Sequence, residues 1–368
     1  MIGCASAALL TGCGGGSSSW SRDRYALAPA AFTASQHTAT LVQDGTVILA
    51  GGSRGLSTLS DAIDRFDPQT ATVLRVGSLA AGRSSHLATR LATGGILITG
   101  GLLSLGDSRA VEIIDERTGA SGNSGSMSVP RIAHAAATLP GGRVLVTGGY
   151  TSGERSPLGI SDSAEIWEPA TRRFRRLSTR MRMGRAAHTA TQLADGRVLV
   201  AGGYTAGPAY QFAEIFDPAD ESFTAVAQDL PLRANHTAHA QSGGAILILG
   251  GETAAVGSGA IVPLASVLRF DAGIGRFSER APLASPRTMS ASVMLPEGDV
   301  LLFGGQLAVP RYTDTAENYD PGSGGKALTS LPTSRALHTV TRLNSGRILI
   351  AGGEMTGGAY ATSLLLYE

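Results

Sequence analysis

The stretch RAAHTATQLADGRVLVAGGY, residues 185–204, contains the pattern that decides the fold. His188 is followed, after thirteen intervening residues, by the glycine pair Gly202 and Gly203. The same spacing occurs six times in the chain, and a seventh copy has Ser290 at the histidine position. Successive glycine pairs are 49, 48, 54, 48, 54 and 48 residues apart. A repeat of this length is typical of one supersecondary unit that stacks against copies of itself.

Each repeat predicts four short strands. The first strand follows the histidine and contains mostly Ala, Thr and Ser, as in residues 188–192, which suits the crowded innermost strand of a radial array. A glycine-containing turn at residues 195–196 leads into the apolar run at residues 198–200, which predicts a strand covered on both faces. The third strand ends in an aromatic–acid step, residues 216–217, and a more polar fourth strand follows.

The seven copies resemble the kelch repeat, with an arginine three residues before the histidine in all but the first. The form with Gly-Arg-Val-Leu-Val before the glycine pair is similar to bacterial kelch propellers, including the propeller of galactose oxidase. The resemblance covers residues 22–368 and implies an all-β fold, a seven-bladed kelch-type β-propeller with four-stranded antiparallel blades. The last repeat stops at Glu368, after its third strand. A strand-like segment at residues 24–28 is available to complete that blade, so we predict that the N-terminal strand closes the ring.

Residues 1–13 differ from the repeats and predict a lipoprotein signal segment. The motif Leu10-Thr-Gly-Cys13 resembles a bacterial lipobox, in which Cys13 is the lipidated residue, and the Gly/Ser-rich residues 14–21 predict a flexible tether. The segment is short and lacks the usual basic residues, so a start upstream of Met1 and an unprocessed apolar tail both remain open. We expect a lipid-anchored protein of the bacterial cell envelope, in the periplasm or outer membrane, that meets the membrane through its anchor only.

The composition limits the classes of partner. Charged residues make up 16% of the chain and the net charge is +1, so no basic field indicates a nucleic acid partner. With 49 glycines and 43% hydrophobic residues, the chain is typical of a turn-rich globular protein. We expect a monomer with a protein or glycan ligand and no cofactor.

The repeated histidines and arginines admit a structural and a functional interpretation. Six histidines share one position in the repeat, which favours a scaffold role over metal binding. The arginines either bond carbonyl groups across blade junctions or form a ring of cations around one mouth of the propeller, and the two roles are compatible. These arginines are Arg83, Arg131, Arg185, Arg233, Arg287 and Arg335, whereas the first repeat has Ala34.

The resemblance also raises the question of catalysis. Galactose oxidase needs copper held by Tyr and His side chains and a Tyr–Cys crosslink, but both cysteines of this chain, Cys4 and Cys13, precede the repeats. We therefore expect no such copper site and no other metal site. N-acetylneuraminate epimerase is a periplasmic kelch enzyme, which keeps a sugar epimerase or mutarotase as the alternative to a binding module. No catalytic residue is identified, so enzyme activity stays open.

Ligand specificity is expected where the repeats differ. The loop between the second and third strands is longer in the third and fifth repeats, at residues 150–163 and 252–265. In an antiparallel blade these loops share one face with the blade-to-blade connections, and variable loops on a rigid scaffold favour binding. We predict that an anionic or sugar-like ligand binds on this face. The candidate contacts are Tyr150, Tyr204, Arg185, Arg233, Glu252 and Glu354.

Overall fold

The computed structural model describes residues 25–55, 58–104, 106–152, 159–205, 211–254, 260–308 and 311–368. The signal segment, the predicted lipidation site Cys13 and the tether lie outside the described residues, as do parts of both long loops. Within the described part, no helix is long and apolar enough to cross a membrane. A short 3-10 turn, η1 (Pro140–Gly142), occurs in the hairpin of the third repeat.

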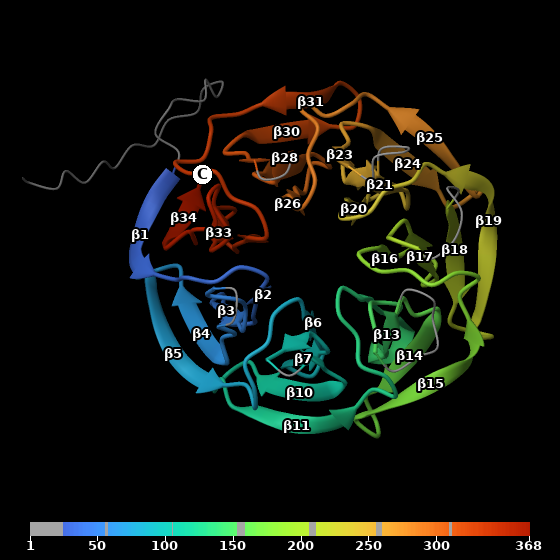
Figure 1. Ribbon diagram of the computed structural model, residues 1–368, viewed down its shortest axis with the longest axis horizontal. Helices are drawn as coiled ribbons and strands as arrows, with labels where there is room; N and C mark the ends of the chain where they lie inside the picture. The colour runs from blue at the N-terminus through green and yellow to red at the C-terminus, as the bar shows by residue number, and fades with distance from the viewer. Residues whose placement is uncertain are drawn as a thin grey trace, which may run out of the picture.

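The small side chains after each histidine form the innermost strand of a blade, so that seven such strands surround one axis (Figure 1). Each inner strand lies next to the inner strand of the following blade, which explains why small residues predominate there. The inner strands of blades 1 to 7 are β2 (Thr38–Leu41), β6 (Leu87–Arg90), β12 (Ala135–Thr138), β16 (Thr189–Gln192), β20 (Thr237–Ala240), β26 (Ala291–Met294) and β32 (Thr339–Arg342).

The apolar run of each repeat forms the second strand, which is buried along its whole length. Because neighbouring blades cover it from both sides, it carries no polar alternation. These strands are β3 (Val47–Ala50), β7 (Gly95–Thr99), β13 (Val144–Thr147), β17 (Val198–Ala201), β21 (Ile246–Leu249), β27 (Val300–Phe303) and β33 (Ile348–Ala351).

The third strand pairs with the second and ends in the aromatic–acid step, and the fourth strand forms the outer edge of the blade. The third strands are β4 (Ala62–Asp67), β10 (Ala110–Asp115), β14 (Ser163–Glu168), β18 (Gln211–Asp217), β24 (Val267–Asp271), β30 (Ala316–Asp320) and β34 (Ser363–Tyr367). The outer strands are β5 (Thr72–Ser78), β11 (Ser121–Ser126), β15 (Arg173–Arg180), β19 (Ser222–Leu230), β25 (Arg276–Arg280), β31 (Gly324–Ala327) and, in blade 7, β1 (Tyr25–Ala31).

The first and last strands of the described chain close the ring. β1 pairs antiparallel with β34, with Tyr25 opposite Tyr367, and their rings lie 5.3 Å apart. The Tyr25 phenol also donates a hydrogen bond to the carbonyl of Thr329 (2.9 Å). Blade 7 therefore contains both ends of the described chain (Figure 1). The predicted fold class, a seven-bladed β-propeller closed by the N-terminal strand, is confirmed.

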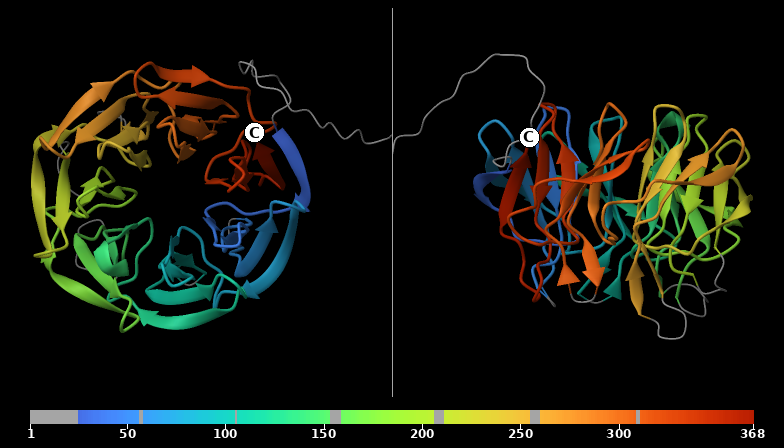
Figure 2. Two further views of the ribbon diagram at one scale, coloured as in Figure 1. Left: turned by 180° about the vertical axis from the view of Figure 1, so that it is seen from behind. Right: turned by 90° about the horizontal axis from the view of Figure 1, so that it is seen from above.

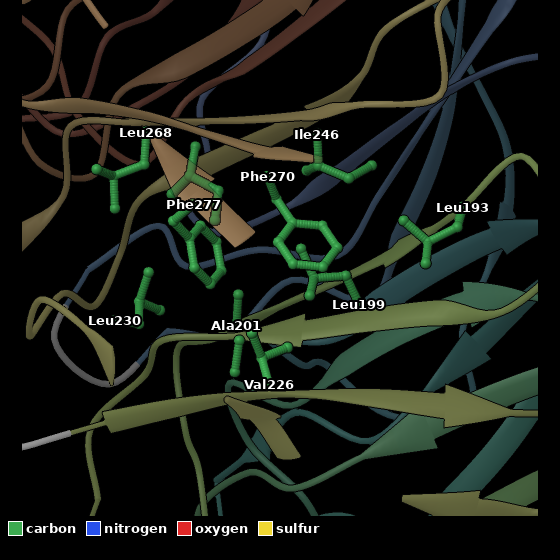
Figure 3. Packing of buried hydrophobic residues seen from close by; sticks show 11 residues of the cluster. Leu193, Leu199, Ala201, Val226, Leu230, Ile246, Leu268, Phe270 and Phe277 are labelled. Atoms are coloured by element: carbon green, nitrogen blue, oxygen red, sulfur yellow. The ribbon is translucent and has the colours of Figure 1, made fainter. Parts of the chain in front are cut away.

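Hydrophobic clusters between neighbouring blades form the core. Between blades 4 and 5, Leu199 and Ala201 of β17 pack with Ile246 of β21 and Phe270 of β24 (Figure 3). Burying an aliphatic or aromatic side chain of this size contributes about 1.5–3 kcal/mol. The core is thus a series of inter-blade layers around the axis, and each blade is stable only between its neighbours.

The glycine pairs connect each blade to the next. In all seven repeats the second glycine donates its N–H to the main-chain carbonyl of the residue three before the next histidine or Ser290, at 2.7–2.9 Å. A Cβ atom on Gly202 would lie 2.5 Å from His236 Cε1 and 2.6 Å from the Arg233 carbonyl, and Gly202 has φ of +69°. Only a residue without a side chain fits such an approach. Ala34 can replace arginine in blade 1 because this link needs only the backbone.

Candidate functional site

The strand directions define two faces of the ring, seen edge-on in Figure 2. The loop-rich face carries the connections from second to third strands and from blade to blade; the turn face carries the other two kinds of turn. On the loop-rich face, the residue after each glycine pair forms a β-bridge with the residue two before the histidine or Ser290. We call these seven residues the mouth positions: Ser53, Leu102, Tyr150, Tyr204, Glu252, Gln306 and Glu354.

A collar of seven main-chain segments surrounds the axis beside the mouth positions. Its residues directly precede the histidines or Ser290, and all have φ between 51° and 56° although none is glycine. Six of the seven are linked by an N–H that donates to the carbonyl of the corresponding residue in the preceding blade. The collar consists of Gln36, Ser85, Ala133, Ala187, Asn235, Met289 and Leu337. The collar hydrogen bonds position the backbone next to the mouth positions.

The repeated arginines are buried inside the blades. Arg185 is 0% exposed and donates to the Gly202 carbonyl (3.0 Å) and to the Glu214 carboxylate (3.1 Å). Arg83, Arg131 and Arg287 make the same type of pair with an acid on the third strand. The interpretation of these residues as carbonyl-binding scaffold is confirmed, although the side chain binds the glycine carbonyl of its own blade.

The expectation that Arg185 and Arg233 contact a ligand is therefore corrected. Arg233 is 2% exposed and donates to the Gly250 carbonyl and to Ser266. Both guanidinium groups turn into their own blade because the glycine carbonyl and third-strand groups lie there. Burial lowers the pKa of Arg233 to about 10, against the smaller opposing effect of the Glu279 charge. The described loop-rich face has no ring of repeated cations.

Five of the six repeated histidines are hydrogen-bonded through Nε2 across blade junctions. His86 Nε2 is hydrogen-bonded to the Thr38 hydroxyl of the preceding blade (3.2 Å), and His134 Nε2 to Thr99 (2.9 Å). Burial lowers the pKa of both histidines to about 3, so they are neutral at physiological pH. In the described part of the chain, no group of three or more His, Cys, Asp or Glu side chains could hold a metal ion. Five of the repeated histidines thus have structural partners, whereas neither ring nitrogen of His338 has a hydrogen-bond partner within the described residues.

The junction with Ser290 is held by a different histidine. His239, on the inner strand of blade 5, is hydrogen-bonded through Nε2 to the Ser292 hydroxyl of blade 6 (2.7 Å). Thr237, which corresponds to the hydroxyl donor of other junctions, is left with a buried and unpartnered Oγ1 within the described residues. His239 thus supplies the inter-blade bond that Ser290 cannot make.

Three of the predicted contacts come together on blades 3 to 5. The Glu252 side chain is 1% exposed; its Oε1 is in contact with the Tyr204 phenol and accepts a hydrogen bond from Asn235 Nδ2 (2.9 Å). Its other oxygen, Oε2, has no hydrogen-bond partner in the described structure. Tyr150 is 37% exposed, and burial together with the Glu252 charge raises its pKa. Burial, the hydrogen bond to Glu252 and its charge raise the pKa of Tyr204, so both phenols stay protonated.

Glu354, another predicted contact, lies in a second group on blades 6 and 7. Its partner across a β-bridge is Tyr360, and Tyr312 of blade 6 lies close by. Burial, the Glu354 charge and a hydrogen bond to that carboxylate raise the pKa of Tyr312. The sequence reasoning missed Asn235, Gln306 and Tyr312. Asn235 and Gln306 could have been found because they occupy variable places next to invariant ones, whereas no sequence signal places Tyr312.

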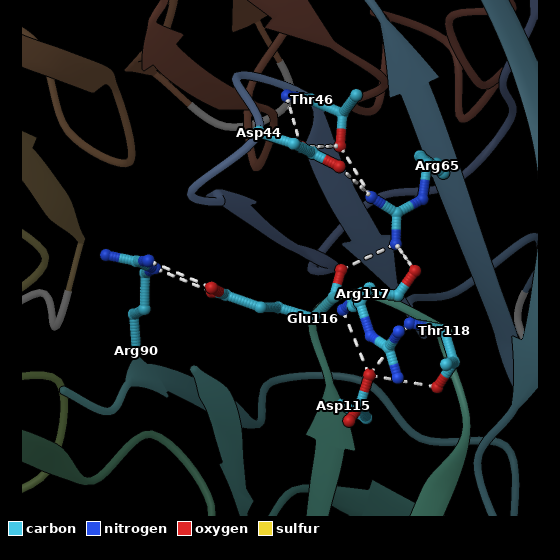
Figure 4. A network of polar contacts seen from close by, with 8 residues as sticks. All are labelled: Asp44, Thr46, Arg65, Arg90, Asp115, Glu116, Arg117 and Thr118. Carbon is cyan, nitrogen blue, oxygen red and sulfur yellow. Dashed lines mark hydrogen bonds and ion pairs between the residues drawn. The ribbon is translucent and has the colours of Figure 1, made fainter. Parts of the chain in front are cut away.

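The turn face also carries hollows. One of about 370 Å³ lies between blades 7 and 1 beside Asp44 and Arg347, and one of about 420 Å³ lies between blades 2 and 3 beside Trp167. Most polar groups near the first are already paired: Arg65 bonds Asp44 and the carbonyls of residues 116 and 117 (Figure 4). Beside the second hollow, the buried indole N–H of Trp167 has no hydrogen-bond partner within the described residues.

Many solved structures resemble the fold, and two of them serve as examples. A novel fungal alcohol oxidase of the AA5 family, in complex with copper, is 16% identical over 93% of this chain and 75% of its own, with a TM-score of 0.75. The structure of YjhT is 18% identical over 77% of this chain and 94% of its own, with a TM-score of 0.58. At such identities the likeness shows the fold alone. No protein-family model and no curated protein matches the sequence.

The copper of the fungal oxidase does not fit the residues described here. The six repeated histidines are buried in blade junctions, and the described chain brings no three His, Cys, Asp or Glu side chains together. We derive no copper chemistry for this protein.

Proposed function

We propose that this propeller is a binding module of the bacterial cell envelope that recognises a glycan at the mouth positions of the loop-rich face. The observation that carries the proposal is the Glu252 carboxylate, with one oxygen held by Tyr204 and Asn235 and the other unpartnered. A buried acceptor is satisfied when a ligand hydroxyl donates to it. The exposed ring of Tyr150 offers a flat apolar surface for a sugar ring beside that acceptor.

The charges of this site favour a neutral ligand. Arg185 and Arg233 are buried and offer no cation to a ligand, whereas the Glu252 and Glu354 carboxylates lie at the mouth positions, so an anionic ligand is disfavoured there. A protein ligand remains the other outcome, in which an exposed peptide presents its N–H and hydroxyl groups to Glu252.

The proposed envelope location is consistent with the direction of the chain. Tyr25, the first described residue, pairs with Tyr367 at the end of a third strand, and therefore lies at the turn face. A lipid on Cys13 would attach on that side and direct the loop-rich face away from the membrane. Metabolic labelling with a palmitate analogue should therefore be lost in Cys13→Ala, and persistent labelling would refute this part of the proposal.

The experiment is a glycan and peptide array probed with the full chain carrying Cys13→Ser. We expect glycan binding that falls at least tenfold in Glu252→Gln, which keeps the shape but weakens the acceptor. Glu297→Gln is the matched control, because it removes the same charge from an exposed hairpin on the turn face. Equal losses in both variants, or binding to peptides alone, would contradict the glycan proposal.

A sugar epimerase or mutarotase is the second candidate. The observation in its favour is the contact between the Glu252 carboxylate and the Tyr204 phenol, which places a proton acceptor and a proton donor side by side. One-dimensional NMR of a freshly dissolved anomer of a bound sugar would detect it. Faster equilibration with the wild-type protein, lost in Glu252→Gln, would establish catalysis and exclude a pure binding role.

A further inference from the structure

We propose that the ligand is an elongated neutral oligosaccharide that lies across blades 4 to 7, from Tyr204 and Glu252 past Gln306 to Glu354. This inference rests on the proposed glycan-binding function and names the ligand class. Three consecutive mouth positions, on blades 5, 6 and 7, carry a carboxylate, a carboxamide and a carboxylate. The mouth positions of blades 1 and 2 instead carry Ser53 and the exposed Leu102. The mouth positions that carry a carboxylate or carboxamide are therefore confined to one arc of the ring, blades 5 to 7.

The second end of this arc repeats the chemistry of the first. Between blades 4 and 5, the Tyr204 phenol contacts the Glu252 carboxylate. At blades 6 and 7 Tyr312 lies beside Glu354, which also faces Tyr360 across a β-bridge. Two tyrosine–glutamate groups at separate places on one arc provide two sugar-binding positions, each with an aromatic ring and a hydroxyl acceptor.

Gln306 connects the two groups. It is 6% exposed and occupies the mouth position between Glu252 and Glu354. In the two-stranded ribbon of blade 6 it stands directly opposite Tyr312, so it shares a face of the ribbon with that tyrosine. A buried amide with both donor and acceptor capacity suits a sugar unit between the two tyrosine–glutamate groups.

Two raised ribbons border this part of the face. β22 (Glu252–Ala254) and β23 (Ile261–Pro263) form one, and β28 (Gln306–Ala308) and β29 (Arg311–Tyr312) form the other. β23 lies beside β28. A third short ribbon, β8 (Leu102–Leu103) with β9 (Gly106–Asp107), belongs to blade 2. The ribbons of blades 5 and 6 thus give the arc a continuous side wall, with Ile261 and Val262 36% and 40% exposed.

The charges along the arc select against an acidic polymer. Glu252 and Glu354 are carboxylates, and Arg311 of β29 is the exposed cation of the same ribbon pair. With two carboxylates at the sugar-contacting positions and one cation on the ribbon, an oligosaccharide of uronic acids is disfavoured relative to a neutral one of equal length.

The test is isothermal calorimetry with cello-, malto- and chito-oligosaccharides of one to six units on the full chain carrying Cys13→Ser. For the series that binds, we expect affinity to rise at least tenfold from the disaccharide to the pentasaccharide. Tyr312→Ala with Tyr360→Ala should remove that gain while changing the disaccharide affinity less than twofold. Tyr204→Ala should weaken both ligands. Oligogalacturonate of five units should bind more weakly than the neutral pentasaccharide.

The calorimetric results test the length of the ligand, its charge and the existence of the glycan site separately. Equal affinity for the disaccharide and pentasaccharide, or a pentasaccharide affinity unchanged in the Tyr312/Tyr360 variant, overturns the elongated ligand but leaves the glycan site. Tighter binding of oligogalacturonate overturns the neutral ligand class. Absence of binding by every series, or binding unaffected by Tyr204→Ala, overturns the proposed site as well. The Tyr312→Phe/Tyr360→Phe variant, which retains both rings, should keep most of the gain and controls for folding.

Discussion

The blade junctions and the mouth positions of this propeller follow opposite rules. At the junctions, arginine, histidine and the glycine pair recur around the ring, and nearly all of these side chains are buried and bonded within the scaffold. One residue further along the chain, the seven mouth positions carry five different residue types. Repetition therefore marks the residues that assemble the ring, and variation on the same backbone marks those free to contact a ligand.

The junctions themselves are not uniform. Four repeated arginines pair with a third-strand glutamate, but blades 5 and 7 have Leu268 and Leu365 at that position. In blade 1 the arginine is missing, and Asp64 is left there with a pKa raised by burial. The buried ion pair is thus dispensable to the fold, whereas every blade has the backbone link from the second glycine to the carbonyl three residues before the next histidine or Ser290.

Removal of the closing strand should have the largest effect on the ring. Deletion of residues 22–31 exposes the edge of β34, including the buried Leu365 and Leu366, to solvent. We expect a fall in melting temperature of roughly 10 °C or more. Deletion of residues 2–20 is the matched control and should leave the thermal transition in place. A melting temperature unchanged by deletion of residues 22–31 would mean that ring closure contributes little to thermal stability.

Breaking a paired junction should cost more than breaking an unpaired one. Arg185→Met leaves the Glu214 carboxylate buried without its cation, at a cost of about 3–5 kcal/mol in the free energy of unfolding. Arg335→Met removes hydrogen bonds to Gly352 and Thr333 but no ion pair, so about 1–2 kcal/mol is expected. Urea unfolding of both variants measures the difference. Equal losses would show that the ion pair adds nothing beyond the hydrogen bonds.

A side chain on the glycine pair should destabilise the junction. Gly202→Ala forces a left-handed conformation on alanine and brings its Cβ against a backbone carbonyl, so we expect a loss of about 2–3 kcal/mol. Gly243→Ala is the control, because no atom lies within 4 Å of a Cβ there, and it should change stability by less than about 0.5 kcal/mol. If the two variants unfold at the same urea concentration, the contact of residue 202 with the next blade does not exclude a side chain there.

The buried histidines predict loss of stability in acid. Burial lowers the pKa of His134 to about 3, below the ordinary value of 6.5, so the unfolded chain binds a proton that the folded one does not. The free energy of unfolding should therefore fall as the pH drops from about 6.5 toward 3, by ~1 kcal/mol per pH unit for each such histidine. In His134→Gln the slope between pH 6 and pH 5 should be smaller. Stability that rises as the pH falls would contradict this assignment.

The repeat was sufficient to predict the fold but not the direction of the arginine side chains. The 48-residue period predicted the number of blades and strands, and the missing last strand predicted ring closure, because both follow from counting units. The arginine position before each inner strand is equally visible, yet spacing does not reveal whether the side chain points outward or back into the blade. The informative signal was a second periodic residue: the third strands of the paired blades carry Glu112, Glu165, Glu214 and Glu317 at one position.

The residues at the mouth positions were predicted only in part, because the repeat period places some of them and not others. Tyr150, Tyr204 and Glu252 follow the glycine pairs, so the repeat places them together on neighbouring blades. Tyr312 stands opposite Gln306 only because of a local ribbon in blade 6, and pairing within an insertion is not encoded by the period.

The central claim is that ligand recognition belongs to the mouth positions and not to the turn face. The most direct measurement is the glycan-array profile of two double variants of the full chain carrying Cys13→Ser, each first shown to keep the wild-type unfolding transition. Tyr150→Ala with Tyr204→Ala should abolish the array signal. Asp44→Ala with Asp195→Ala, on the turn face, should retain it. A signal that survives the tyrosine substitutions and disappears with the aspartate substitutions would place the binding site on the opposite face and contradict the account.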